Sequence, residues 1–135
     1  MPYKIEQIEG IGPKKAELFA RGGIKTTDDL LDRCCDPKGR KSISSLTTIR
    51  ERDLLKFANL ADLMRVSGIG EEYSELLEAA GVDTVKELRT RRADNLAAKL
   101  KEVNEQKKLT RTVPNEAAVQ RMIDGAKELD PRVTH

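Results

Sequence analysis

The chain contains the stretch Glu9-Gly10-Ile11-Gly12-Pro13-Lys14-Lys15-Ala16, which recurs 58 positions later as Ser67-Gly68-Ile69-Gly70-Glu71-Glu72-Tyr73-Ser74. The correspondence extends without a gap from residues 5–31 to residues 63–89. Apolar residues align with apolar residues and glycines with glycines, in pairs that include Ile5/Leu63, Ile8/Val66, Leu18/Leu76, Gly23/Gly81, Ile24/Val82, Thr26/Thr84 and Leu30/Leu88. An ungapped match of this kind indicates an internal duplication.

Apolar spacing, prolines and glycines predict helices along the whole chain and no strand of useful length. The first helix begins at Pro13 and stops at Gly22-Gly23, and residues 71–80 form its counterpart. We expect a turn at residues 36–40 and further helices over 42–46, 49–60 (capped by Thr48), 85–91, 94–108 and 115–129. The predicted fold class is therefore all-α, with about eight to ten short helices in two units. The units are residues 1–62 and residues 63–135, the second with a C-terminal helix.

Composition limits the function classes. The net charge is only +2 although 36% of residues are charged, which is less basic than most dedicated nucleic-acid binders. No run approaches the roughly 18 apolar residues of a membrane span, and no secretory leader is evident. We therefore expect a cytoplasmic protein without a membrane partner. Cys34 and Cys35 are adjacent, without metal-ligand spacing, and His135 is the only histidine, so no metal or other cofactor is expected.

Each glycine turn resembles the helix-hairpin-helix motif. The shared pattern is apolar-x-x-apolar-x-Gly-apolar-Gly-x-x-x-small, which residues 5–16 match closely and residues 63–74 match with Ser74 as the small residue. The first glycine allows the sharp turn, because glycine tolerates a left-handed backbone. The isoleucine packs between the helices, and the second glycine exposes backbone N–H groups at a helix start.

The resemblance also implies that each hairpin has a partner, because such motifs usually occur in pairs within a five-helix unit. Residues 45–55 are the candidate partner of the first hairpin, with Thr47-Thr48-Ile49 where the glycines would be. Residues 92–103 are the candidate partner of the second hairpin and contain no glycine. Without the glycines, a packing role is favoured for both partners over phosphate contact.

The chain as a whole is similar to a bacterial family of tandem helix-hairpin-helix proteins that is described as a domain of unknown function. The similarity extends from residue 5 to about residue 128 and is carried by residues 8–12, 55–65, 68–73, 80–88 and 100–104. It implies a fold but no activity.

The first hairpin has suitable chemistry for binding phosphate. A helix N-terminus attracts anions, and Lys14 and Lys15 follow the turn directly. By resemblance to DNA-binding members of the motif class, backbone amides of the hairpin would hold phosphate oxygens without reading bases. If the basic stretch after residue 36 lies beside the hairpin, the two form one patch. The candidate nucleic-acid-binding residues are Gly10, Ile11, Gly12, Lys14, Lys15, Lys38, Arg40 and Lys41.

The second hairpin has the opposite charge. Glu71 and Glu72 stand where the first copy has Pro13 and Lys14, and two carboxylates repel a phosphate. The turn Gly68-Ile69-Gly70 is therefore predicted to be structural or to face a protein partner.

Catalysis has little support in the sequence. Some helix-hairpin-helix proteins are base-excision enzymes with a catalytic Asp or Lys after the hairpin, and Asp83 and Lys86 follow the second turn here. They fit a helix-cap region on a solvated face, and no nucleophile–base pair accompanies them. The leading hypothesis is a non-enzymatic protein that binds DNA or RNA through phosphates, independently of sequence. The alternative is a protein–protein adaptor that uses the acidic hairpin and the apolar C-terminal helix.

Overall fold

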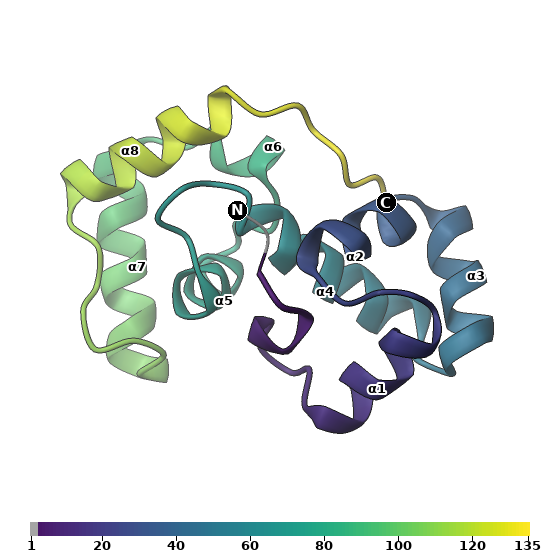
Figure 1. Cartoon of the computed structure of the whole chain (residues 1–135). Helices are drawn as coiled ribbons and strands as arrows, with labels where there is room; N and C mark the ends of the chain where they lie inside the picture. The colour runs from purple at the N-terminus through teal and green to yellow at the C-terminus, as the bar shows by residue number, and fades with distance from the viewer. Residues whose placement is uncertain (1–2) are drawn as a thin grey trace.

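The computed structural model describes residues 3–135, so the first two residues of the predicted first unit lie outside it. The described residues form eight α-helices and a short 3₁₀-helix, η1, and their only β-type pairing is an isolated bridge between Lys4 and Thr26 (Figure 1). The prediction of an all-α chain with eight to ten helices is confirmed. The elements are η1 Ile5–Gln7, α1 Pro13–Arg21, α2 Thr27–Cys34, α3 Pro37–Thr47, α4 Glu51–Leu63, α5 Glu71–Ala79, α6 Val85–Leu88, α7 Ala93–Lys107 and α8 Glu116–Lys127.

The two glycine turns have the same local structure. Gly10 and Gly68 both adopt a left-handed backbone, with φ of 94° and 92°. The next glycine in each turn is extended and is the N-cap of a nine-residue helix, α1 or α5. Within both turns the N–H of the central isoleucine donates to the carbonyl three residues earlier, at 3.1 Å. The bounds and bonds of the two segments therefore correspond at the 58-residue offset.

The correspondence continues into the following helices. Thr26 accepts a hydrogen bond from the N–H of Asp29 at 3.1 Å, and Thr84 accepts one from the N–H of Glu87 at 3.4 Å. These threonines cap α2 and α6, as their side-chain chemistry favours. Packing is also matched, because α2 and α3 pack on α4 while α6 and α7 pack on α8.

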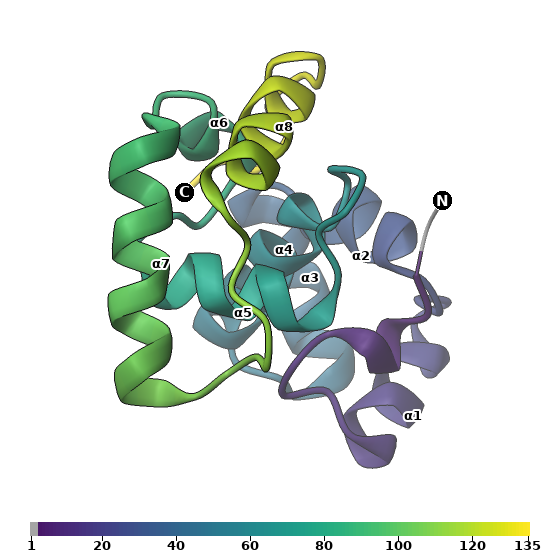
Figure 2. The same ribbon diagram turned by 90° about the vertical axis from the view of Figure 1, so that its left-hand side faces the viewer.

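The buried apolar side chains form two clusters that meet at the end of α4. One cluster comes from residues 5–64 and the other from residues 63–126, with Met64 in the first and Leu63 in the second. Figure 1 shows α1–α3 on one side of α4 and α5–α8 on the other, and Figure 2 shows α7 and α8 from the side, in front of the first-half helices.

The sequence prediction was wrong around residues 36–48. Residues 36–40 are not a free turn, because Asp36 Oδ1 accepts a hydrogen bond from the N–H of Gly39 at 2.7 Å and Pro37 occupies the first position of α3. An Asp N-cap followed by Pro is a strong helix start. Thr48 ends α3 with a left-handed backbone, φ 66°, rather than capping α4. The N-cap of α4 is Arg50.

Cys34 gives the fold a testable dependence on alkaline pH. Its thiol is buried at the end of α2, and desolvation raises its pKa from 9.0 to about 11, although Arg40 and Arg33 act in the opposite direction. The unfolded thiol ionises from about pH 9 whereas the folded one stays protonated. The stabilising contribution of the buried thiol is therefore complete below pH 9 and is lost as the pH rises to 11.

We expect the free energy of unfolding of the parent protein to fall by about 2 kcal/mol more than that of Cys34→Ala between pH 9 and pH 11. Urea unfolding at several pH values measures this difference, and comparison with the variant removes the contribution of other alkaline groups. Cys35→Ala is the control. Its free energy of unfolding should fall between pH 9 and pH 11 as much as that of the parent, since it leaves the buried Cys34 thiol in place. Equal losses in the parent and Cys34→Ala would contradict the prediction.

Candidate nucleic-acid interface

The first hairpin is fixed by its contact with α4. Gly10 has a left-handed backbone, and a Cβ at this position would stand 3.2 Å from Cε1 of Phe57. Conformation and space both therefore favour glycine there. Ile11 is buried in the first cluster, so the turn is anchored from inside. Gly12 is exposed and extended, and it directs the chain into α1.

The start of α1 offers free donors next to positive charge. Among the described residues, none accepts a hydrogen bond from the backbone N–H of Lys14 or Lys15, as is usual for the first turn of a helix. The side chain of Lys14 is exposed and that of Lys15 is half-buried. Within the described helix, the first turn of α1 carries no acidic side chain. The N-terminal dipole and two ammonium groups thus attract anions together.

Acidic groups border this hairpin on the side of α5. Burial raises the pKa of Glu75, and the nearby carboxylate of Glu9 raises it further, while the ammonium group of Lys56 acts in the opposite direction. Glu9 therefore lies close enough to Glu75 of α5 for the two carboxylates to repel each other. An anion approaching the hairpin is repelled from the α5 side and attracted from the side of Lys14.

The structure does not bring the three cations of α3 to the first hairpin. Arg40 is only 4% exposed, and its guanidinium donates to the carbonyls of Cys34 at 3.0 Å and Thr134 at 2.7 Å. Arg40 is therefore not available to a phosphate in this structure, which corrects the expectation of a single patch.

Lys38 and Lys41 are exposed but lie in the first turns of α3. The helices α1 and α3 approach each other at their C-terminal ends, since a Cβ on Gly22 would stand 3.1 Å from Cδ2 of Leu46. Figure 1 shows α1 beginning at the bottom of the molecule, whereas α3, at the right, begins at its upper end and runs downward. The hairpin lysines and the α3 lysines thus belong to different surfaces.

The second hairpin has the same turn in an acidic setting. Its Ile69 carbonyl accepts a hydrogen bond from Tyr3 Oη at 3.4 Å. Glu71 and Glu72 are exposed and line an open hollow of about 420 Å³ together with Gly68, Gly70, Tyr73 and Thr110. The charge difference predicted from the sequence between the two turns is thus displayed at the surface.

A third turn reproduces the hairpin backbone without glycine. Thr48 is left-handed, Ile49 is buried, and Arg50 is extended at the start of α4. This is the order of conformations seen at Gly10, Ile11 and Gly12. The sequence predicted the turn at Thr47-Thr48-Ile49, one residue earlier, and a left-handed threonine is rare enough that its backbone was not predictable. Residues 92–103 lie almost wholly within α7 and form no such turn.

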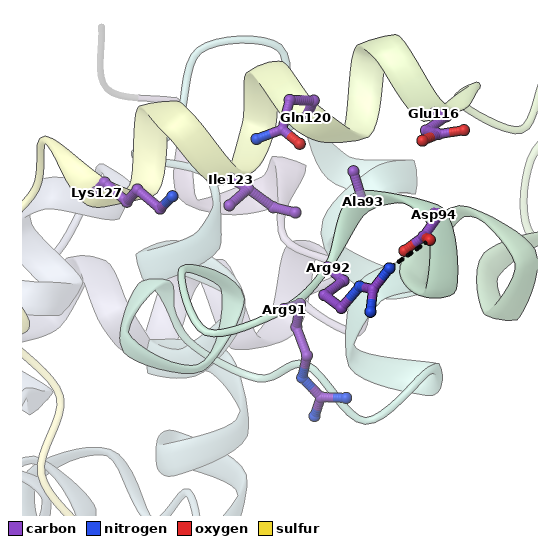
Figure 3. A pocket seen from close by; sticks show the side chains of 8 residues that line it. All are labelled: Arg91, Arg92, Ala93, Asp94, Glu116, Gln120, Ile123 and Lys127. Atoms are coloured by element: carbon purple, nitrogen blue, oxygen red, sulfur yellow. Dashed lines mark hydrogen bonds and ion pairs between the residues drawn. The ribbon is translucent and has the colours of Figure 1, made fainter.

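A polar hollow of about 360 Å³ lies between the start of α7 and α8, but its cations do not converge. Figure 3 shows the side chain of Arg91 directed away from α8 and that of Arg92 directed toward Asp94. Arg92 pairs with Asp94 at 2.9 Å, and Arg91 pairs with Glu87 at 2.7 Å. Arg91 and Arg92 are therefore engaged in ion pairs with nearby residues and do not point together into the hollow.

Neither a metal site nor a membrane-spanning helix is found in the described part of the chain. Residues 3–135 contain no group of three or more His, Cys, Asp or Glu side chains that could hold a metal ion. None of the helices in these residues is long and apolar enough to cross a membrane.

Comparison with protein families places the chain in one of them. A family model described as a domain of unknown function, DUF4332, matches residues 9–129. The chain belongs to the DUF4332 family. This confirms the expected membership of a domain-of-unknown-function family, whereas a bacterial origin and helix-hairpin-helix repeats stay predictions. No curated protein and no solved structure matches the chain.

Proposed function

We propose that the protein binds nucleic acid through its phosphate backbone, without reading base sequence, at the first hairpin and the start of α1. One observation carries the proposal: an exposed helix start with free N–H groups at Lys14 and Lys15, whose first turn in the described helix has no acidic residue. Backbone amides and lysines bind phosphate without sequence preference. Arg40 is left out of this interface because it is buried.

We further propose that residues 5–31 and 63–89 are duplicated helix-hairpin-helix elements within units 1–62 and 63–135. The support is the shared turn conformation, the matched helix starts and the equivalent hydrogen bonds at the 58-residue offset. In this proposal the copies have diverged in function, since only the first retains lysines at the helix start. The predicted cytoplasmic location stays a prediction.

The decisive variant is Lys14→Glu with Lys15→Glu. We expect it to weaken binding to two unrelated 20-base-pair duplexes about equally, because phosphate contacts carry no sequence information. The slope of log K against log salt should also become shallower by about one for each phosphate that the variant no longer neutralises. Fluorescence anisotropy titrations from about 50 to 300 mM salt measure both quantities.

Two matched reversals serve as controls. Glu71→Lys with Glu72→Lys changes the equivalent turn and should leave binding unchanged or strengthen it, because repulsion is removed. Lys38→Glu with Lys41→Glu changes as many lysines on a different surface and should have the smaller effect. A parent protein that binds neither DNA nor RNA at about 50 mM salt, where non-specific contacts are strong, would end the proposal.

A protein–protein role is the second candidate, and the acidic hollow at the second hairpin favours it. A partner for this surface would be basic. The adaptor hypothesis predicts no affinity for nucleic acid and loss of the partner in Glu71→Lys with Glu72→Lys. We propose a binding role rather than catalysis in either case. Asp83 and Lys86 lie at the start of α6, where Asp83 is half-buried beside His135 (3.9 Å between Oδ2 and Nε2).

A further inference from the structure

Residues 130–134, here called the strap, follow α8 and cross to α2 and α3 in the first half of the chain (Figure 1). The strap is held there through the backbone of Thr134. The N–H of Thr134 donates to the carbonyl of Cys35 at 2.8 Å, and its carbonyl accepts from Arg40 Nη2 at 2.7 Å. The N–H and the carbonyl of this one residue are therefore both bound by the same surface.

The two preceding strap residues make contacts of a different kind. Arg132 Nη2 pairs with Asp32 Oδ1 at 2.6 Å. Val133 is half-buried and packs against the apolar cluster of the first half. Three consecutive residues are thus recognised by charge, by apolar contact and by backbone hydrogen bonds.

The strap binds to a surface formed by Asp32, Cys35 and Arg40, here called the seat, which is left with an unpaired buried group when the strap is absent. Within the described structure the Arg40 guanidinium donates to two carbonyl oxygens, of which Thr134 supplies one. Removal of that acceptor leaves a buried guanidinium partly unsatisfied, which is costly. The family match ends at residue 129, so the seat lies within the matched region and the strap lies outside it.

We propose that this seat is a binding site for an extended peptide with an arginine followed by an apolar residue, and that the strap is its exchangeable intramolecular ligand. Backbone hydrogen bonds give such a site affinity, while the contacts to the arginine and the apolar side chain give it selectivity. A tethered ligand competes at a millimolar effective concentration, so the strap keeps weak external peptides out. The proposal is independent of phosphate binding at the first hairpin.

The test uses the full chain with its strap weakened by Arg132→Glu and Val133→Asp. The probe is a fluorescein-labelled peptide with the sequence of residues 130–135. We expect it to bind the weakened variant at least about tenfold more tightly than the parent, because the internal competitor is lost. Arg132→Glu alone is the second variant, and it alters only a surface ion pair whose partners are 33% and 64% exposed.

A charge exchange provides the matched control. For this control the strap is weakened by Arg132→Ala and Val133→Asp, so that it cannot pair with an arginine at position 32. In that background Asp32→Arg should reduce binding of the arginine peptide about tenfold, and a peptide with glutamate in place of that arginine should recover the loss. Exchange of the Thr134 amide, followed by NMR, reports strap docking directly and should be slow in the parent and fast in the weakened variant. Fast exchange in the parent, or no gain in peptide binding once exchange has become fast, would overturn the proposal.

Discussion

Asp62→Ala is expected to lower the free energy of unfolding by about 3–5 kcal/mol, the usual cost of removing one member of a buried pair. The side chain of Asp62 is fully buried near the end of α4. Its Oδ1 accepts from Arg65 Nη1 at 2.7 Å, and its Oδ2 accepts from the backbone N–H of Val85 at 2.9 Å. The alanine variant leaves the arginine without its carboxylate and the first N–H of α6 without an acceptor.

Urea unfolding at neutral pH measures this loss. Asp53→Ala on the same helix is the matched control, because its pair with Arg50 at 3.1 Å is largely exposed on the arginine side and such pairs contribute at most about 1 kcal/mol. A similar small loss for Asp62→Ala would show that the buried carboxylate does not hold α4 to α6.

The contact of Asp62 has a counterpart at the aligned helix start in the first half of the chain. In the first copy the N–H of Thr27, the counterpart of Val85, donates to the carbonyl of Tyr3 at 2.9 Å. The same helix start is therefore satisfied by a backbone carbonyl in one copy and by a carboxylate in the other. The donor lies within each of the two aligned segments, 5–31 and 63–89, while the acceptor comes from the residues just before each segment.

The parts of the fold that depend on local sequence were predictable. Pro13 and the glycine pair at 22–23 bound α1, and Thr84 caps α6, because these signals need only neighbouring residues. For α2 the sequence left Thr26 and Thr27 open as caps, and the cap is Thr26. The first hairpin is local in the same sense, so the candidate site could be located from the sequence.

The features that were missed depend on distant contacts. Arg40 was expected at the surface but is buried, and one of its acceptors is Thr134, which lies 94 positions away. The separation of Lys38 and Lys41 from the first hairpin follows from the direction in which α3 packs, which no local pattern specifies. Sequence reasoning also missed the strap, because extended residues after a helix carry no periodic signal.

Leu76→Ala is expected to lower the free energy of unfolding by about 2–5 kcal/mol, whereas Leu18→Ala should cost about 1 kcal/mol. The two leucines are aligned at the 58-residue offset, and from the sequence we expect both to be buried. Leu76 is 1% exposed, whereas Leu18 is only half-buried. The difference follows from packing, since α5 packs on both α4 and α7 while the main neighbours of α1 are η1 and α3.

The two variants control for each other because the chemistry of the substitution and the type of helix are the same. Urea unfolding of both at one pH gives the difference directly, and an unchanged m-value shows that the unfolded states are comparable. Equal losses of unfolding free energy would mean that Leu18 in α1 is as enclosed as Leu76 in α5. The face of the first hairpin that is free to bind phosphate would then not be the outer face of α1. A larger loss for Leu76→Ala supports an α1 whose outer face is free to approach a phosphate backbone.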